Sequence, residues 1–138
     1  MRDMSADPAT LHAFVRQYKE TAEWCQTYRR LGVHDEITSE DVTGQGYPWS
    51  AAANAQVERD CLDFLSGLTP ELLDLVSESA ERAGHDFLLT RNGHGAGFWD
   101  GDWPEAEGRE LTKHAKAQGT AAYEIDDDGN IVCIGRER

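Results

Sequence analysis

Basic residues are scarce in this sequence, with 13 Lys and Arg against 26 Asp and Glu, a formal net charge of −13. A surface with this balance repels nucleic acid and anionic membranes and attracts basic protein surfaces. We expect no signal peptide, and the sequence has no apolar run of membrane-spanning length. We therefore expect a soluble cytoplasmic protein that binds neither nucleic acid nor membranes directly.

Cysteine is equally scarce. Cys25, Cys61 and Cys133 are far apart and odd in number, and no CxxC or Cys/His pair has the spacing of a zinc site. This pattern argues against a disulfide framework and predicts buried thiols in a reducing compartment. No cofactor and no metal are expected.

The length of 138 residues predicts one domain of the α+β class. Apolar spacing, capping residues and glycine stops predict about four helices and a small four-stranded antiparallel sheet, in the order ααα-ββ-α-ββ. The predicted helices are 7–31, 50–65, 69–83 and 105–118, and the predicted strands are 86–91, 95–99, 120–125 and 130–134. Residues 1–6 are expected to form a flexible tail, 7–84 a mainly helical acidic half, and 85–138 a ββ-α-ββ half.

The most distinctive segment runs from His85 to Asp100, HDFLLTRNGHGAGFWD. Its β-prone start leads into Asn92-Gly93, a dipeptide suited to positive φ at a hairpin turn. We expect Phe98 and Trp99 to pack on the core, and Asp86 to pair with Arg91 across the ends of the hairpin. The candidate motif residues are Asp86, Arg91, Asn92, Gly93, His94, Gly95, Gly97, Phe98, Trp99 and Asp100.

This segment resembles a DFWLTRNGHGAGFWD-like run found in small acidic proteins of bacteriophages and prophages. The matching stretch is 86–100, followed by Leu111-Thr112 and Asp127-Asp128-Gly129, with a looser match at 60–64. The resemblance implies a viral origin and hence the cytoplasm of a bacterial host. It implies no particular activity.

The negative charge is concentrated in one part of the chain. Between Leu31 and Thr90 there are twelve acids and only two bases, a net charge of −10. On the predicted helix 69–83, four carboxylates fall within an arc of about 80° and stand about 5–6 Å apart, a scale similar to that of phosphates along a DNA strand. Together with two acids of the preceding helix, the candidate partner-binding residues are Asp60, Asp63, Glu71, Asp74, Glu78 and Glu81.

The competing hypothesis is a metal-dependent hydrolase built on His85, Asp86, His94 and Asp100. His85-Asp86 is similar to the metal-binding HD pair of some phosphohydrolases, but the sequence places His85 at the start of a strand, without the helical context that such a pair requires. A third hypothesis is a non-catalytic phage structural or regulatory module whose acidity only keeps it in solution.

We therefore expect a binding protein without catalytic residues. Its size, charge and resemblance favour a phage-type inhibitor of a host nucleic-acid-binding defence protein, of the anti-restriction or anti-CRISPR kind, that occupies the basic surface of its partner by nucleic-acid mimicry. The sequence does not predict the oligomeric state.

Overall fold

The computed structural model describes residues 7–25, 28–29, 36–37, 47–94 and 96–137. The expected tail at 1–6, Gly95 and most of the segment between the first two predicted helices lie outside the described residues. The described elements are α1 (Pro8–Cys25), β1 (Tyr28–Arg29), β2 (Glu36–Ile37), α3 (Ala51–Ser66), α4 (Pro70–Glu78), α5 (Ala80–Arg91), α6 (Glu105–Ala117), β3 (Thr120–Ile125) and β4 (Ile131–Glu137).

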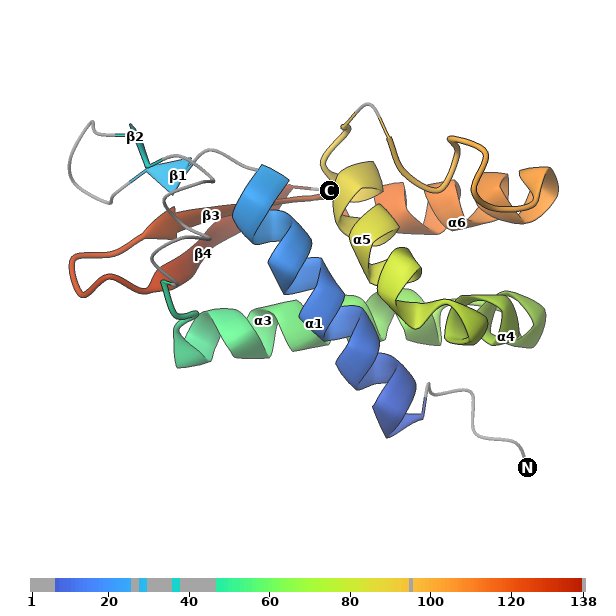
Figure 1. The fold of residues 1–138 in the computed structure, drawn as a ribbon, viewed down its shortest axis with the longest axis horizontal. Helices are drawn as coiled ribbons and strands as arrows, with labels where there is room; N and C mark the ends of the chain where they lie inside the picture. The colour runs from blue at the N-terminus through green and yellow to red at the C-terminus, as the bar shows by residue number, and fades with distance from the viewer. Residues whose placement is uncertain (1–6, 26–27, 30–35, 38–46, 95, 138) are drawn as a thin grey trace.

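The α+β class is confirmed, although the element count differs from the prediction. The described residues form five helices, and each of the two antiparallel sheets has only two strands, β1–β2 and β3–β4. In Figure 1, α1 crosses in front of α3, and the β3–β4 hairpin extends to the end of the molecule opposite α4 and the start of α6. None of the described helices is long and apolar enough to cross a membrane.

Three predicted helix starts are confirmed by their capping hydrogen bonds. The Asp7 carboxylate accepts from the backbone N–H groups of Ala9 and Thr10, at 2.9 and 3.0 Å. Ser50 caps α3 and Thr69 caps α4 in the same way, each through its hydroxyl. A cap satisfies backbone donors that have no partner within the first helical turn. The predicted extension of the first helix to residue 31 is wrong, because α1 ends at Cys25 and β1 follows.

The predicted helix 69–83 and the predicted strand 86–91 are both wrong. The helix is interrupted at Ser79, which has φ −141° and ψ 53°, and a new helix, α5, begins at the next residue. Every residue from 86 to 91 is buried, so this half of α5 has no polar face. A short apolar run that is buried all round is not distinguishable from a strand by periodicity. The helix also runs across the expected boundary between the two halves at 84–85.

Gly84 does not end a helix; it lies inside α5 where that helix crosses α1. A Cβ atom built on Gly84 would lie 2.2 Å from the backbone oxygen of Phe14. No residue with a side chain fits this separation without moving the backbone of one helix. The glycine therefore sets how closely the two helices approach.

The Asn92-Gly93 dipeptide ends α5 and does not form a hairpin. Gly93 has the predicted positive φ, +73°. Its N–H donates to the carbonyl of Thr90 at 3.2 Å, and the N–H of His94 donates to the carbonyl of Leu89 at 2.9 Å. These two bonds make up the Schellman arrangement that ends many helices. The predicted strand 95–99 is also wrong, because the described residues there form turns and bends.

The last helix and the final hairpin are confirmed. The turn between β3 and β4 is closed by Asp126, whose carboxylate accepts from the N–H groups of Asp128 and Asn130 at 3.0 and 2.8 Å. Gly129 supplies the positive φ, +82°. Ile131 ties the hairpin to the start of α3 through backbone bonds with Pro48 and Ser50, at 2.7 and 2.9 Å.

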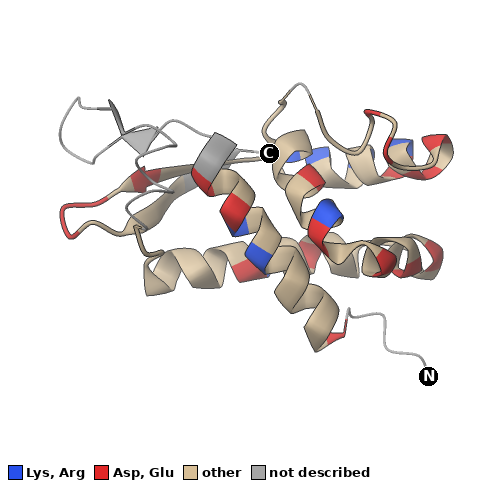
Figure 2. Cartoon of the chain, viewed as in Figure 1, with Lys and Arg blue, Asp and Glu red and all other residues tan. Residues whose placement is uncertain are grey.

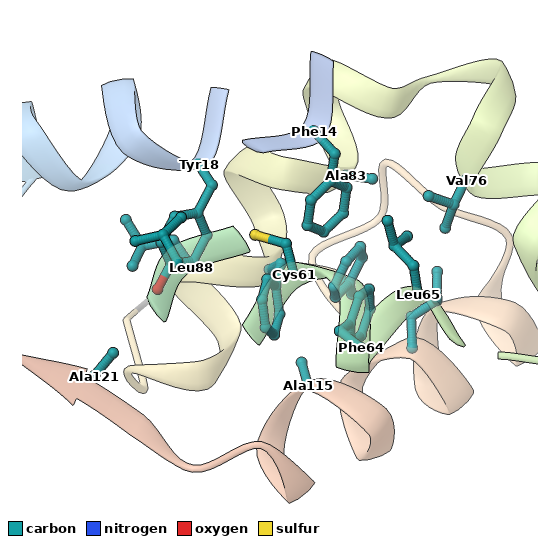
Figure 3. Close-up of a cluster of buried hydrophobic side chains, with 14 of the residues drawn as sticks. Phe14, Tyr18, Cys61, Phe64, Leu65, Val76, Ala83, Leu88, Ala115 and Ala121 are labelled. Carbon is teal, nitrogen blue, oxygen red and sulfur yellow. The ribbon is translucent and has the colours of Figure 1, made fainter. Parts of the chain in front are cut away.

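The core is a stack of aromatic rings between the helices. Phe64 lies 4.4 Å from Phe87 and 5.7 Å from Phe98, measured between ring centroids, and Phe14 lies 5.8 Å from Phe64. Figure 3 shows Phe14, Phe64 and Ala115, from α1, α3 and α6, around the same cluster. The core thus joins helices from both halves of the sequence.

Of the predicted buried thiols, Cys61 is confirmed and Cys133 is only half-buried. Burial raises the pKa of the Cys61 thiol well above its usual value, so that the thiol stays protonated at neutral pH. The Cys25 side chain lies outside the described residues.

Candidate functional site

Helix α4 presents an acidic face to solvent. Glu71, Asp74 and Glu78 are all exposed, while Leu72 and Val76 on the opposite side are buried in the core. The helix contains no Lys or Arg. Its three carboxylates occur at spacings of three and four residues, which places them on one side of the helix. We refer to Glu71, Asp74 and Glu78 as the α4 acidic face.

The predicted stripe does not continue unchanged to Glu81. The break at Ser79 places Glu81 in α5, and its exposed carboxylate forms an ion pair with Arg16 of α1. Both side chains are more than half exposed, so the pair contributes little to stability. The pair offsets the charge of Glu81, which therefore differs from the exposed carboxylates of Glu71 and Glu78 on α4.

Asp60 does not belong to the surface, contrary to the sequence prediction. Its side chain is 1% exposed and lies 3.0 Å from the Arg91 guanidinium, which is itself fully buried. Gln56 donates a further hydrogen bond to the Asp60 carboxylate at 2.8 Å. Because the inner face of α3 carries Asp60 into the core, only Asp63 of the two predicted α3 residues is exposed.

Many basic side chains of the described residues are engaged by acids away from α4. The pairs are Arg16–Glu81, Arg82–Asp102, Arg91–Asp60, Arg109–Glu105 and Lys113–Glu110. Within the described part of the chain, Glu71, Glu78 and Asp63 take part in none of these ion pairs. Figure 2 shows acidic segments on α4 and at the start of α6, at the end of the molecule away from the hairpin, and a further acidic segment on the turn of the hairpin itself. The described surface therefore carries negative charge at both ends, and α4 is one of its acidic elements.

The residues of the 86–100 motif serve mainly to hold helices together. The Asp86 carboxylate is buried and accepts from the Trp103 indole N–H at 2.6 Å, while its other oxygen lies 2.9 Å from His85 Nδ1. The Thr90 hydroxyl accepts from the N–H of Phe98 at 3.0 Å. Both contacts fasten α5 to the segment that leads into α6.

Arg91 and Asn92 connect α5 to the end of α6 and the start of β3. The Arg91 guanidinium donates to the carbonyls of Gly119 and Gln118, at 2.7 and 3.3 Å. The Asn92 amide both donates to and accepts from the backbone of Ala121, at 3.1 and 2.8 Å. The predicted pairing of Asp86 with Arg91 is wrong, because each residue has a different partner.

Arg91 also belongs to a buried network with two tyrosines. It donates to the Tyr18 hydroxyl at 3.1 Å, and the hydroxyls of Tyr18 and Tyr123 lie 2.6 Å apart. Burial raises the pKa of both phenols above their usual value of about 10. This network is not predicted from the sequence, because the two tyrosines and Asp60 occupy ordinary inner positions of helices or strands and apolar spacing gives no signal for it.

A pH dependence of stability follows from the two tyrosines. In the folded state the raised pKa keeps them neutral, whereas in the unfolded chain they ionise near pH 10, so their contribution is constant below about pH 10 and is lost as the pH rises above it. We expect the free energy of unfolding, measured by denaturant titration, to fall across this range. Tyr123→Phe should flatten the fall, and an unchanged slope would contradict the assignment.

The residues of the hydrolase hypothesis do not form one site. His85 and Asp86 lie together, and they are in a helix, contrary to the strand predicted there. The Asp100 carboxylate accepts from the backbone N–H groups of Gly97 and Asp102, at 3.2 and 3.4 Å, and His94 follows the end of α5. Across the described residues, no group of three or more His, Cys, Asp or Glu side chains is arranged to hold a metal ion.

Phe98 and Trp99 differ in environment although they are adjacent. Phe98 is buried as predicted, but Trp99 is 53% exposed, so its predicted packing on the core is wrong. The reason is that Gly97, with φ +156°, and the turn held by Asp100 direct only one of the two rings inward. Trp99 thus adds an aromatic surface near the acidic start of α6.

Comparison with protein-family models, with curated proteins and with solved structures finds no significant match to this chain.

Proposed function

We propose that this protein is a non-catalytic accessory protein that places its α4 acidic face on a basic, nucleic-acid-binding surface of another protein and thereby inhibits it. The observation that carries the proposal is the exposure of Glu71, Asp74 and Glu78 on a helix without a single basic residue. A solvated helix face that only keeps a protein in solution has no need of such segregation, because mixed charges serve solubility as well.

The geometry of the face suits a partner that normally binds phosphates. Glu78 lies seven positions after Glu71, which corresponds to about 10 Å along the helix axis. This distance is similar to the axial rise of three nucleotides in duplex DNA, at about 3.4 Å each. Carboxylates on a rigid helix therefore present negative charge at intervals that a row of Lys and Arg side chains can meet.

The partner that we propose is a host nucleic-acid-binding defence protein, so that the activity is of the anti-restriction or anti-CRISPR kind. The resemblance of residues 86–100 to a phage and prophage motif supports this choice. The net charge of −13 supports it independently, because such a charge accelerates encounter with a basic surface and disfavours direct binding to nucleic acid.

Neutralising the α4 acidic face should abolish most of the binding without unfolding the protein. We expect the variant Glu71→Gln/Asp74→Asn/Glu78→Gln to retain at most about a tenth of the wild-type affinity. The variant loses its close charge pairs with the partner, and a total loss of about 1.4 kcal/mol of binding free energy corresponds to a tenfold loss of affinity. The measurement is affinity capture from a nuclease-treated bacterial lysate, followed by titration of the captured protein.

The matched control removes three charges at the opposite end of the molecule, with Glu124→Gln/Asp127→Asn/Asp128→Asn on the β3–β4 hairpin. Asp127 and Asp128 are exposed, as are the α4 residues. The control should bind as the wild type does. Equal loss of binding in both variants would show that only the total charge matters, and unchanged binding in the α4 variant would remove α4 from the interface.

A further inference from the structure

A groove of about 480 Å³ lies between the start of α6 and the segment that precedes it. Phe98 and Trp103 lie beneath it, almost fully buried, with their ring centroids 5.5 Å apart in an edge-to-face arrangement. Trp99 also lines the groove, and at 53% exposure it is the most exposed large hydrophobic side chain of the described residues. An exposed tryptophan next to a hollow is typical of an interface anchor.

The backbone around Trp99 is fixed before any partner arrives. The N–H of Phe98 is held by the Thr90 hydroxyl at 3.0 Å, and the N–H of Gly97 is held by the Asp100 carboxylate at 3.2 Å. A Cβ atom on Gly97 would lie 2.2 Å from the Thr90 hydroxyl oxygen, so this segment packs too closely for another residue. A rigid anchor loses little conformational entropy on binding.

The charges around the groove favour a cationic occupant. Asp100 and Asp102 are exposed in the segment that carries Trp99, where Asp102 pairs with Arg82 at 3.0 Å, and Glu105 lines the groove itself. The basic side chain in the groove is Arg109, 3.4 Å from Glu105, and both members of this pair are more than 60% exposed. Such a pair is weak, so that Glu105 can exchange its partner at little cost.

We propose that this groove receives an arginine side chain of the basic partner, with the guanidinium on the Trp99 ring and its charge near Glu105. Arginine fits better than lysine because its planar group stacks on aromatic faces and is less strongly hydrated. The inference rests on the proposed function and adds a second contact to it. The start of α6, which carries the lining residue Glu105, and α4 both lie at the end of the molecule opposite the hairpin (Figure 1).

The test uses the full chain and a synthetic peptide of alternating arginine and glycine. Citrulline is shaped like arginine but carries no charge, so a citrulline–glycine peptide is the matched control. We expect the arginine peptide to shift the indole N–H resonance of Trp99 in a ¹H–¹⁵N spectrum, with the resonance assigned from a Trp99→Phe variant. The citrulline peptide should leave it in place, and a lysine–glycine peptide should bind more weakly than the arginine peptide.

Trp99→Leu keeps an apolar side chain but removes the aromatic face, and it should weaken binding of the arginine peptide about tenfold, as expected for a partly desolvated cation–π contact. Ile134→Ala, at another exposed apolar position that is 49% accessible, is the control and should bind as the wild type does. Amide spectra establish that each variant is folded.

The outcomes separate the groove from the α4 acidic face. An unchanged affinity of Trp99→Leu for the arginine peptide would overturn the proposal that the groove binds arginine. If the α4 variant still lost affinity for the captured partner, the proposed function would stand without the groove. A peptide that bound the α4 variant as tightly as the wild type but lost affinity for Trp99→Leu would support the groove as an arginine site separate from the α4 acidic face. An indole shift of equal size with the citrulline peptide would overturn the cationic occupant.

Discussion

Replacing Arg91 with methionine should destabilise the fold by about 3–5 kcal/mol, because it leaves the buried Asp60 carboxylate without its cation. The Arg91 side chain is fully buried and its guanidinium is 3.0 Å from Asp60. The same group donates to the carbonyls of Gln118 and Gly119, which lose their bonds as well. Denaturant titration of the wild type and the variant, with comparison of the two free energies of unfolding, measures the effect.

Two further variants make this expectation specific. Arg82→Met removes an arginine whose pair with Asp102 is about half exposed, so it should cost less than about 1 kcal/mol. Adding Asp60→Leu to Arg91→Met removes the stranded carboxylate and should restore part of the lost stability. If Arg91→Met lowered the free energy of unfolding as little as Arg82→Met does, the contacts of Arg91 would not be what holds α5 to α3 and to the start of β3.

Replacing Gly84 with alanine should destabilise the protein by about 3 kcal/mol, the upper part of the usual range for overpacking. The added methyl group would meet the backbone of Phe14 at 2.2 Å, and neither helix can move without disturbing the aromatic stack. Helix propensity alone gives the opposite sign, because alanine is favoured over glycine inside a helix by about 1 kcal/mol. Thermal and denaturant unfolding both measure whether Gly84→Ala lowers or raises the stability of the protein.

Gly67→Ala is the matched control for this substitution. Gly67 has φ −81°, and a Cβ atom built there would make only ordinary contacts, the nearest at 3.5 Å. We expect a change within about 0.5 kcal/mol, as for most surface substitutions. A Gly84→Ala variant more stable than the wild type would show that α1 and α5 do not approach as closely as described.

Capping and turn residues in the sequence were sufficient to predict where some helices and turns begin. Asp7, Ser50 and Thr69 begin helices because their side chains accept from backbone donors two or three residues later, and this chemistry is written in the sequence. The Asp126–Asn130 turn is local in the same sense. Each of these elements occurs at the position that its capping or turn residues predict.

Elements determined by distant contacts were not predictable in this way. Residues 86–91 are all buried, by contacts that include α1, α3 and α6, and this burial removes the amphipathic pattern that identifies a helix. Gly84 carried the same ambiguity, because a helix stop and a close helix crossing both require glycine. Only the position of Phe14 in three dimensions distinguishes the two.

The candidate site was predictable in part for the same reason. Glu71, Asp74 and Glu78 are exposed because apolar residues on the same helix fix which side faces the core. Asp60 looked equally acidic in the sequence, yet its burial depends on Arg91, 31 residues away. Trp99 was expected in the core, and its exposure follows from a turn that the sequence did not reveal.

The most direct test of the central claim asks whether this protein and duplex DNA exclude one another on the captured partner. The displacement of labelled DNA from the partner is followed by fluorescence anisotropy as the protein is added, at several DNA concentrations. We predict full displacement of the DNA, with a midpoint that rises in proportion to the DNA concentration. We also predict that the protein–partner complex weakens at high salt, because the Debye screening length falls to about 3 Å at about 1 M ionic strength. A partner that held DNA and this protein at the same time, with unchanged affinity for each, would contradict nucleic-acid mimicry by α4.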